Sequence, residues 1–311
     1  MSQTRHAGIS PATVESVAGL SAGIVSTLVV HPLDIVKTRM QLYRSIGKAS
    51  LSSPPTTVAL LRSLYANPRP VATLYRGLTP NLLGNAVSWA SFFFFKSRFE
   101  SAISMFRGHG GRLSASDYFA ASALAGASTS LLTNPIWVLK TRMLSSDRGT
   151  RGAYPSMMAG AKSIYATEGI RGFYRGLAVS LVGVSHGAVQ FAVYEPAKRM
   201  YYAHRESVRG IDSSAPITPE ATVVISSCAK LIAGAVTYPY QVVRSRLQNY
   251  HADEQFGRGL RAVVQRIWRE EGAKGFYRGI VPGVARVMPA TWVTFLVYEN
   301  VKFHLPRMLA S

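Results

Sequence analysis

A short segment occurs three times along the chain at a nearly constant spacing, and this repetition constrains the fold more than any other feature. Each copy contains a proline, a basic residue five positions later and a second basic residue two positions after that. The prolines are Pro32, Pro135 and Pro239, so the copies lie 103 and 104 residues apart. A fixed period indicates that one arrangement of secondary structure is repeated and packs against its own copies. The sequence therefore predicts three repeats, at residues 1–110, 111–212 and 213–311.

Each repeat contains two charge-poor segments that are long enough to cross a membrane. Only 16% of the 311 residues are charged, whereas a soluble protein carries about 25%. The segments are rich in small residues, which let helices approach closely in lipid. The predicted fold is an all-α membrane protein, in which six transmembrane helices form three tandem repeats of about 100 residues in a pseudo-threefold bundle. The predicted spans are 14–33, 78–95, 118–139, 176–194, 221–243 and 279–298, and short amphipathic helices are predicted at 57–65, 156–165 and 260–270.

The net charge of +20 does not indicate a nucleic-acid partner, because the basic residues lie mostly between the spans and form no single stripe. One cysteine, Cys228, excludes an intrachain disulfide and a zinc site of several thiolates. The sequence has no glycine-rich phosphate loop, nucleophile elbow or cluster with metal-ligand spacing, so we expect neither an enzyme nor a metal site. No signal peptide is expected within the first ten residues. A transporter, an ion-conducting pore and a basic structural protein of anionic membranes remain as alternatives.

Two cations lie inside the predicted spans, and an ionisable residue at membrane depth indicates function. Arg286 and Lys230 are both predicted roughly 12 to 14 Å from the same end of the bundle. No carboxylate is expected at that depth, so we predict that a bound anion, such as a diphosphate or a pteroyl glutamate, neutralises them. The alternative is that Lys230 extends to the membrane surface and Arg286 donates to backbone carbonyls.

A second motif of aromatic, basic and glycine residues occurs at 75–77, 174–176 and 277–279. Together with the proline motif, it resembles the mitochondrial carrier family over essentially the whole chain. The resemblance implies a monomeric carrier of the inner mitochondrial membrane, with short helices in the matrix and both termini toward the intermembrane space. It also implies alternating access around a central site.

The segments 134–142, 183–191 and 237–244 narrow this resemblance to one branch. They are similar to carriers of FAD and folate, within a group that also moves NAD and pyrimidine nucleotides. FAD is the preferred substrate and folate the first alternative, followed by NAD or a pyrimidine nucleotide. Uniport and exchange both remain open, and no cofactor is expected apart from the transported substrate.

The resemblance also implies which residues bind the substrate. Small residues at the contact positions of two even-numbered helices would leave room for a ring system, and one tryptophan could stack on it. That tryptophan could instead belong to the interface belt of the membrane, and the histidine could be structural. The predicted substrate-binding residues are Arg286, Lys230, Gly84, Asn85, Trp89, Gly183, Val184 and His186.

Two gates are implied, one at each end of the central site. On the matrix side, only Asp34 retains the acid of the family motif, and we predict that it pairs with Lys140, while two glutamines brace the pairs. On the cytoplasmic side, only Glu195 with Lys302 is expected to form a complete pair. The predicted matrix gate comprises Asp34, Lys37, Trp137, Lys140, Gln241, Arg244, Gln41 and Gln248, and the cytoplasmic gate comprises Glu195, Lys198, Glu299 and Lys302.

Arg-Gly pairs precede the three even-numbered spans, where free backbone amides at a helix N-terminus can bind phosphate. In the family, such sites hold cardiolipin. The alternative is that glycine only allows tight packing and helix capping. The predicted lipid-binding residues are Arg76, Gly77, Arg175, Gly176, Arg278 and Gly279.

Overall fold

The computed structural model describes residues 11–43, 55–106, 113–147, 153–209 and 218–308. Within these ranges the secondary structure is helical, without a strand, as the sequence predicted. All six predicted spans are helices, three of them interrupted by a short break. The spans are α1 (Pro11–Leu42), α4 (Leu78–Phe106), α5 (Ala115–Ser145), α7 (Leu177–Val182) with α8 (Ser185–Arg209), α9 (Pro219–Val236) with α10 (Tyr238–Gln248), and α13 (Ile280–Ala285) with α14 (Val287–Met308). The predicted repeat boundaries at 110/111 and 212/213 fall outside the described residues.

Short helices connect the two spans of each repeat, as predicted. Threonine and serine side chains cap two of them, because Thr56 accepts a hydrogen bond from the Ala59 amide at 3.2 Å and Ser156 accepts one from the Ala159 amide at 3.2 Å. These elements are α2 (Thr57–Tyr65), α3 (Pro70–Leu74), α6 (Met157–Phe173), α11 (Ala252–Phe256), α12 (Gly259–Glu271) and the 3₁₀ turn η1 (Ala273–Tyr277).

By length and hydropathy, three of the described helical segments could cross a membrane on their own, and a fourth if the bent pair α9 and α10 counts as one span. The helices α4 and α5 are 29 and 31 residues long, which is sufficient length, but neither is among the segments that meet the hydropathy criterion. Polar residues such as Asn81 and Asn85 lower the hydropathy of α4. Weak hydropathy of this kind is typical of helices that face a polar interior.

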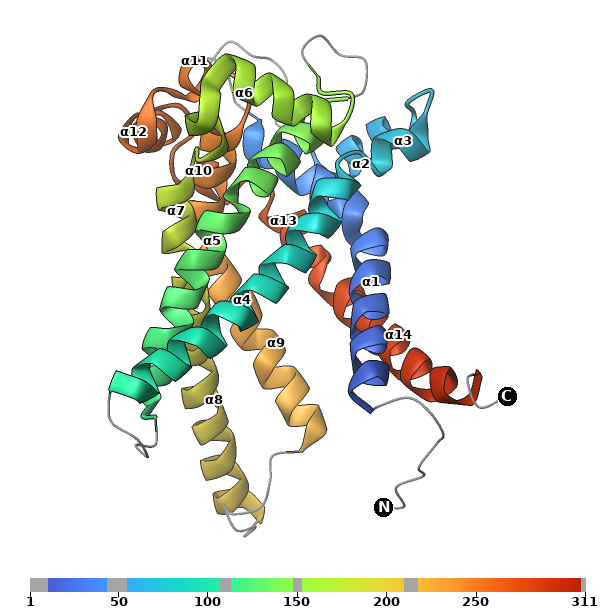
Figure 1. Cartoon of the computed structure of the whole chain (residues 1–311), viewed down its shortest axis with the longest axis vertical. Helices are drawn as coiled ribbons and strands as arrows, with labels where there is room; N and C mark the ends of the chain where they lie inside the picture. The colour runs from blue at the N-terminus through green and yellow to red at the C-terminus, as the bar shows by residue number, and fades with distance from the viewer. Residues whose placement is uncertain (1–10, 44–54, 107–112, 148–152, 210–217, 309–311) are drawn as a thin grey trace.

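The spans converge at one end of the molecule and separate at the other (Figure 1). Along the bundle, α1 packs against α14, α4 against α5, and α8 against α9. Near the short helices, α1, α5 and α10 all contact one another, so the three odd-numbered spans meet there. We call this the closed end and the opposite one the splayed end.

The repeated prolines do not all have the same effect. Pro239 lies at a break between α9 and α10, where the chain bends by 53°. Pro32 and Pro135 lie inside the continuous helices α1 and α5. The predicted kink is therefore seen as a complete break in the third repeat, where proline removes a backbone hydrogen bond.

Three arginines join the repeats into a ring at the closed end. Each occupies the last basic position of its proline motif and donates from Nε to a backbone carbonyl of the next repeat. The three bonds are Arg39 to Leu144 at 3.2 Å, Arg142 to Gln248 at 3.0 Å and Arg246 to Gln41 at 3.0 Å. We call this set the arginine ring.

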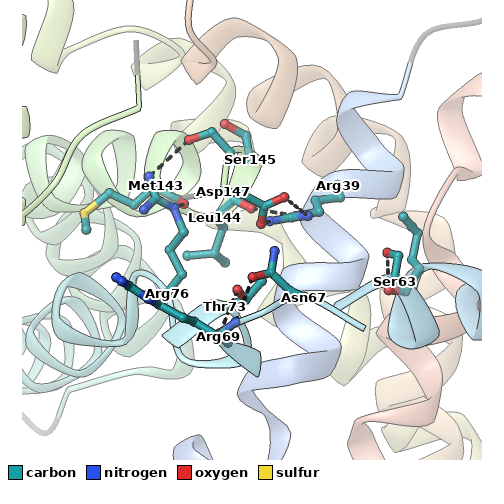
Figure 2. Close-up of polar contacts among 12 residues, drawn as sticks. Arg39, Ser63, Asn67, Arg69, Thr73, Arg76, Met143, Leu144, Ser145 and Asp147 are labelled. Carbon is teal, nitrogen blue, oxygen red and sulfur yellow. Dashed lines mark hydrogen bonds and ion pairs between the residues drawn. The ribbon is translucent and has the colours of Figure 1, made fainter. Parts of the chain in front are cut away.

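A carboxylate pairs with each arginine of the ring, but the first repeat obtains its carboxylate differently. Arg142 and Arg246 pair with Glu168 and Glu271 of their own repeats, at 2.5 and 2.6 Å. The first repeat has no acid in the corresponding loop, and Arg39 instead pairs at 2.5 Å with Asp147 of the second repeat (Figure 2). The junction between repeats one and two therefore depends on a carboxylate borrowed from the neighbouring repeat.

Candidate functional site

A cavity of about 280 Å³ lies at the closed end, where the odd-numbered spans meet. Side chains from all three repeats line it, and all eight residues predicted for the matrix gate are among them. The lining residues are Asp34, Lys37, Thr38, Gln41, Trp137, Lys140, Thr141, Tyr240, Gln241, Arg244, Ser245, Gln248 and Arg286.

Asp34 is buried and lies between two cations of other repeats. Its Oδ1 accepts a hydrogen bond from Arg286 Nη1 at 2.6 Å, and its Oδ2 lies 3.9 Å from Lys140 Nζ. The predicted contact with Lys140 is therefore present, but it is the longer of the two. The prediction that no carboxylate reaches Arg286 is wrong. Counting residues along a helix gives depth only, whereas Arg286 lies between the separate helices α13 and α14 and extends its side chain to Asp34.

Two further polar residues support Asp34, and sequence reasoning did not identify them. Asn81 Nδ2 lies 3.4 Å from Asp34 Oδ2 and 3.1 Å from His31 Nδ1. The other ring nitrogen of His31 lies 2.9 Å from the backbone carbonyl oxygen of Arg76, so a proton on Nε2 would leave Nδ1 free to accept from Asn81. In the sequence, the only indication of this contact was a polar residue, Asn81, in a predicted span that carries no charge.

The two bracing glutamines connect different repeats. Gln41 accepts from the Ser245 hydroxyl at 2.7 Å and donates to the Tyr238 hydroxyl at 3.2 Å. Gln248 accepts from the Thr141 hydroxyl at 3.1 Å. Both glutamines thus hold odd-numbered spans together beside the cavity, through hydroxyl groups.

Trp137 occupies the position of the second family acid, and two cations lie near its ring. Lys140 Nζ lies 4.8 Å and the Arg244 guanidinium 5.9 Å from the ring. Both distances allow a cation–π interaction. An aromatic face thereby replaces a carboxylate as the local partner of these cations.

The space expected beside Gly84 and Gly183 is occupied by the protein's own aromatic side chains. A Cβ atom added at Gly84 would lie 3.4 Å from the Trp137 ring, and one at Gly183 would lie 3.0 Å from the Tyr240 ring. The prediction that these glycines leave room for a substrate ring is wrong in this conformation. Glycine here permits close packing of an even-numbered span against an odd-numbered one.

The remaining predicted substrate residues do not line the cavity. Lys230 is exposed, and Trp89 is 64% exposed and stacks on Phe93 of the same helix at 5.8 Å. Val184 packs against Gly126, and His186 Nδ1 lies 2.8 Å from the Thr237 hydroxyl. Asn85 is also absent from the lining.

At the splayed end, the predicted pair between Glu195 and Lys302 is not formed among the described residues. Lys302 Nζ instead lies 2.6 Å from Glu15 Oε1, and the Tyr298 hydroxyl donates to the same carboxylate. The reason is that α1 packs along α14, whereas α8, which carries Glu195, packs against α9. The pair between Glu195 and Lys302 therefore stays a prediction for a conformation in which the splayed end is closed. Of the other two predicted residues of this gate, Glu299 is exposed and Lys198 is half-buried, with its Nζ 6.0 Å from the Tyr194 ring.

The three Arg-Gly pairs do open helices. Gly77, Gly176 and Gly279 have φ angles of +71°, +73° and +81°, which L-residues with a Cβ rarely adopt, and each directly precedes a helix. Their arginines are held by protein groups, because Arg76 donates to the Met143 carbonyl at 2.7 Å (Figure 2) and Arg278 lies 2.5 Å from Glu271. Tight packing at these glycines is observed, and phosphate binding there stays a prediction.

Arg175 joins the second and third repeats outside the membrane spans. Its guanidinium lies 2.6 Å from Glu168 and 2.9 Å from Asp253. Hydrogen bonds from Arg175 hold the pKa of Asp253 below its ordinary value of 3.8. Burial alone raises the pKa of Glu168, but hydrogen bonds and charge from Arg142 and Arg175 outweigh it and hold this pKa below 4.5.

We expect thermal stability to decline on acidification for this reason. A carboxyl whose pKa is lower in the folded protein stabilises the fold above its unfolded pKa, and that contribution is lost as the pH falls through the folded pKa. The melting temperature of the purified protein in detergent should fall below about pH 4. The double variant Glu168→Gln with Asp253→Asn should start lower and show a weaker decline. An equal decline in the variant would contradict this assignment.

A pseudo-threefold bundle of membrane-length helices around a cationic cavity, closed at one end and splayed at the other, has the architecture of a solute transporter. The chain belongs to the mitochondrial carrier family, because residues 10–106, 111–205 and 216–309 each match the family described as Mitochondrial carrier protein. It is therefore a transporter of a mitochondrial membrane.

Full-length relatives support this membership. The chain is 37% identical over 309 residues to the mitochondrial FAD carrier protein FLX1 of Saccharomyces cerevisiae, which covers 95% of this chain and 98% of the relative. It is 34% identical to the chloroplastic folate transporter 1 of Arabidopsis thaliana, over 91% of this chain and 92% of the relative. It is 33% identical to the chloroplastic nicotinamide adenine dinucleotide transporter 1 of the same plant, over 94% and 92%.

Proposed function

We propose that the protein carries FAD across the inner mitochondrial membrane by alternating access. The observation that carries the choice of substrate is the similarity to a FAD carrier over nearly the whole of both chains. The cationic cavity supports an anionic substrate of this kind. Folate is the second candidate, because a folate transporter is also a full-length relative.

In this proposal, the structure corresponds to a conformation closed toward the matrix and open toward the intermembrane space. The closed end carries the short helices and the part-buried contact between Asp34 and Arg286. At the splayed end, Lys302 of α14 pairs with Glu15 of α1 and not with Glu195 of α8. Both chain termini would face the intermembrane space, and closing the splayed end would bring Glu195 toward Lys302.

Arg286 is the proposed point at which substrate binding is coupled to the matrix gate. It lines the cavity, and it also donates to the carboxylate that holds the odd-numbered spans. An anionic substrate that draws this guanidinium away from Asp34 would weaken the closed end. We further propose that the carrier acts as a monomer and that cardiolipin binds at the Arg-Gly helix openings.

Uptake into liposomes that contain the purified protein tests this function. Labelled FAD, a reduced folate, NAD and a pyrimidine nucleotide are compared at equal concentration, with protein-free liposomes as the control. We expect saturable uptake of FAD that exceeds uptake of the other solutes. Preloading with unlabelled FAD distinguishes exchange from uniport. Saturable folate uptake without FAD uptake would replace the substrate, and uptake of none of the four would refute the proposal.

A further inference from the structure

The cavity at the closed end contains more positive charge than its own carboxylate can neutralise. Its lining includes four cations and one acid, an excess of three positive charges. The cations come from all three repeats, so the excess is concentrated where the odd-numbered spans meet. The lining cations are Lys37, Lys140, Arg244 and Arg286, and the acid is Asp34.

The contacts divide these cations into two groups. Asp34 is already engaged by Arg286 at 2.6 Å and by Lys140 at 3.9 Å. Lys37 and Arg244 have only neutral partners among the described residues. Lys37 donates to the Gln241 amide oxygen at 2.9 Å.

Arg244 is the least satisfied of these cations. Its guanidinium lies 5.9 Å from the Trp137 ring, and its Nε is buried without a hydrogen-bond partner among the described residues. A buried donor of a charged group that makes no hydrogen bond is costly, and the cost is removed when an anion binds to it. Arginine also binds phosphate well, because its guanidinium can donate two parallel hydrogen bonds to phosphate oxygens.

The missing acids explain where the excess comes from. The position two residues after the motif proline is Asp34 in the first repeat, but it is Trp137 in the second and Gln241 in the third. Two carboxylates are thus absent from a pseudo-threefold set, whereas all three basic positions are occupied. A ligand that carries two negative charges would replace the two missing acids and reduce the excess from three positive charges to one, and the cavity of about 280 Å³ has room for a diphosphate group.

We propose that this gate cavity is itself a substrate subsite, in which a diphosphate group binds between Lys37, Lys140 and Arg244. The bound diphosphate supplies the charge that Trp137 and Gln241 do not. This inference rests on the proposed function in one respect, because the diphosphate would belong to a transported dinucleotide. It distinguishes a dinucleotide from a folate, whose anionic groups are carboxylates.

The test uses inorganic pyrophosphate as the probe and thermal stability of the purified protein in detergent as the readout. Sulfate, orthophosphate and glutamate are added in parallel at matched ionic strength. We expect pyrophosphate to raise the melting temperature in a saturable way and at concentrations at least about tenfold below those needed for the other anions.

The decisive variant restores one acid of the motif. Gln241→Glu places a carboxylate where the amide oxygen already lies 2.9 Å from Lys37 Nζ. It should raise stability without ligand and weaken pyrophosphate binding at least about tenfold. Gln265→Glu makes the same chemical change on the exposed side of α12 and should leave the pyrophosphate response unchanged. Arg244→Gln should also lose the response.

Each result decides the inference independently of FAD uptake. A pyrophosphate response that persists in Gln241→Glu, or an equal response to sulfate, would overturn the subsite. A response to glutamate but not to pyrophosphate would overturn the diphosphate and favour a dicarboxylate. A specific pyrophosphate response in a protein that takes up no FAD would uphold the subsite and refute only the proposed function.

Discussion

Replacing Arg286 with alanine is expected to lower the initial rate of substrate uptake at least about thirtyfold. The substitution removes the cation that lies closest to buried Asp34. The Asp34 carboxylate would then be paired only with Lys140, whose Nζ lies 3.9 Å away. Truncating one partner of a buried, hydrogen-bonded charge pair costs roughly 2 to 5 kcal/mol, and each 1.4 kcal/mol corresponds to about a factor of ten. Because the Arg286 side chain is 37% exposed, the lower end of this range applies. The measurement is uptake into liposomes at matched protein content.

Two matched variants separate the charge of Arg286 from its shape. Arg286→Lys retains a cation within reach of Asp34 and should keep a measurable part of the uptake. Asp34→Asn removes the other partner and should impair uptake as well, because Arg286 would then lack its carboxylate. Undiminished uptake by Arg286→Ala, in a protein whose melting temperature shows that it is folded, would contradict the role assigned to this residue.

The second large effect is expected on stability, from Glu271. Its carboxylate is fully buried between two arginines, at 2.6 Å from Arg246 and 2.5 Å from Arg278. Glu271→Gln would leave two guanidinium groups beside a neutral amide, and breaking a buried ion pair in this way costs roughly 3 to 5 kcal/mol. We expect a clearly lower melting temperature in detergent.

An exposed glutamate in the same region provides the control. The side chain of Glu254 on α11 is 80% exposed, and Glu254→Gln should change the melting temperature little, because exposed charges contribute at most about 1 kcal/mol. Equal melting temperatures for Glu271→Gln and Glu254→Gln would show that the buried carboxylate does not hold the closed end together.

The repeat pattern was sufficient to predict the helices. The recurrence of the motifs at Pro32, Pro135 and Pro239 placed equivalent residues at equivalent positions, and the charge-poor segments between them are helical where expected. The glycines of the Arg-Gly pairs were predicted to open helices and do so with positive φ. These features depend on local sequence, which is why they could be predicted without the structure.

Contacts between helices could not be predicted in the same way. A residue's place along a helix gives its depth, but the direction and reach of its side chain decide its partner. Arg286 therefore reaches Asp34, although the sequence analysis had excluded a carboxylate at that depth. Likewise, Trp137 and Tyr240 fill the space beside the glycines, because the packing of one span against another determines which space remains open.

The pair between Glu195 and Lys302 illustrates a further reason. A transporter sequence encodes at least two conformations, and a structure represents one of them. Residues that meet only when the splayed end closes remain apart in this conformation, so Lys302 is found with Glu15 instead. Sequence motifs of the two gates therefore describe alternative states that do not coexist.

The arginine ring limits how many repeats such a bundle can contain. Each repeat supplies one arginine donor and one carbonyl acceptor to its neighbours, and the last donor, Arg246, returns to Gln41 of the first repeat. No donor or acceptor of this kind is left over, just as closing a β-barrel removes its edge strands. Head-to-tail junctions of this kind close into a ring only when the rotation between neighbouring copies divides a full circle, and three copies around a pseudo-threefold axis meet this condition. The number of repeats is thus tied to the angle at which one repeat docks on the next.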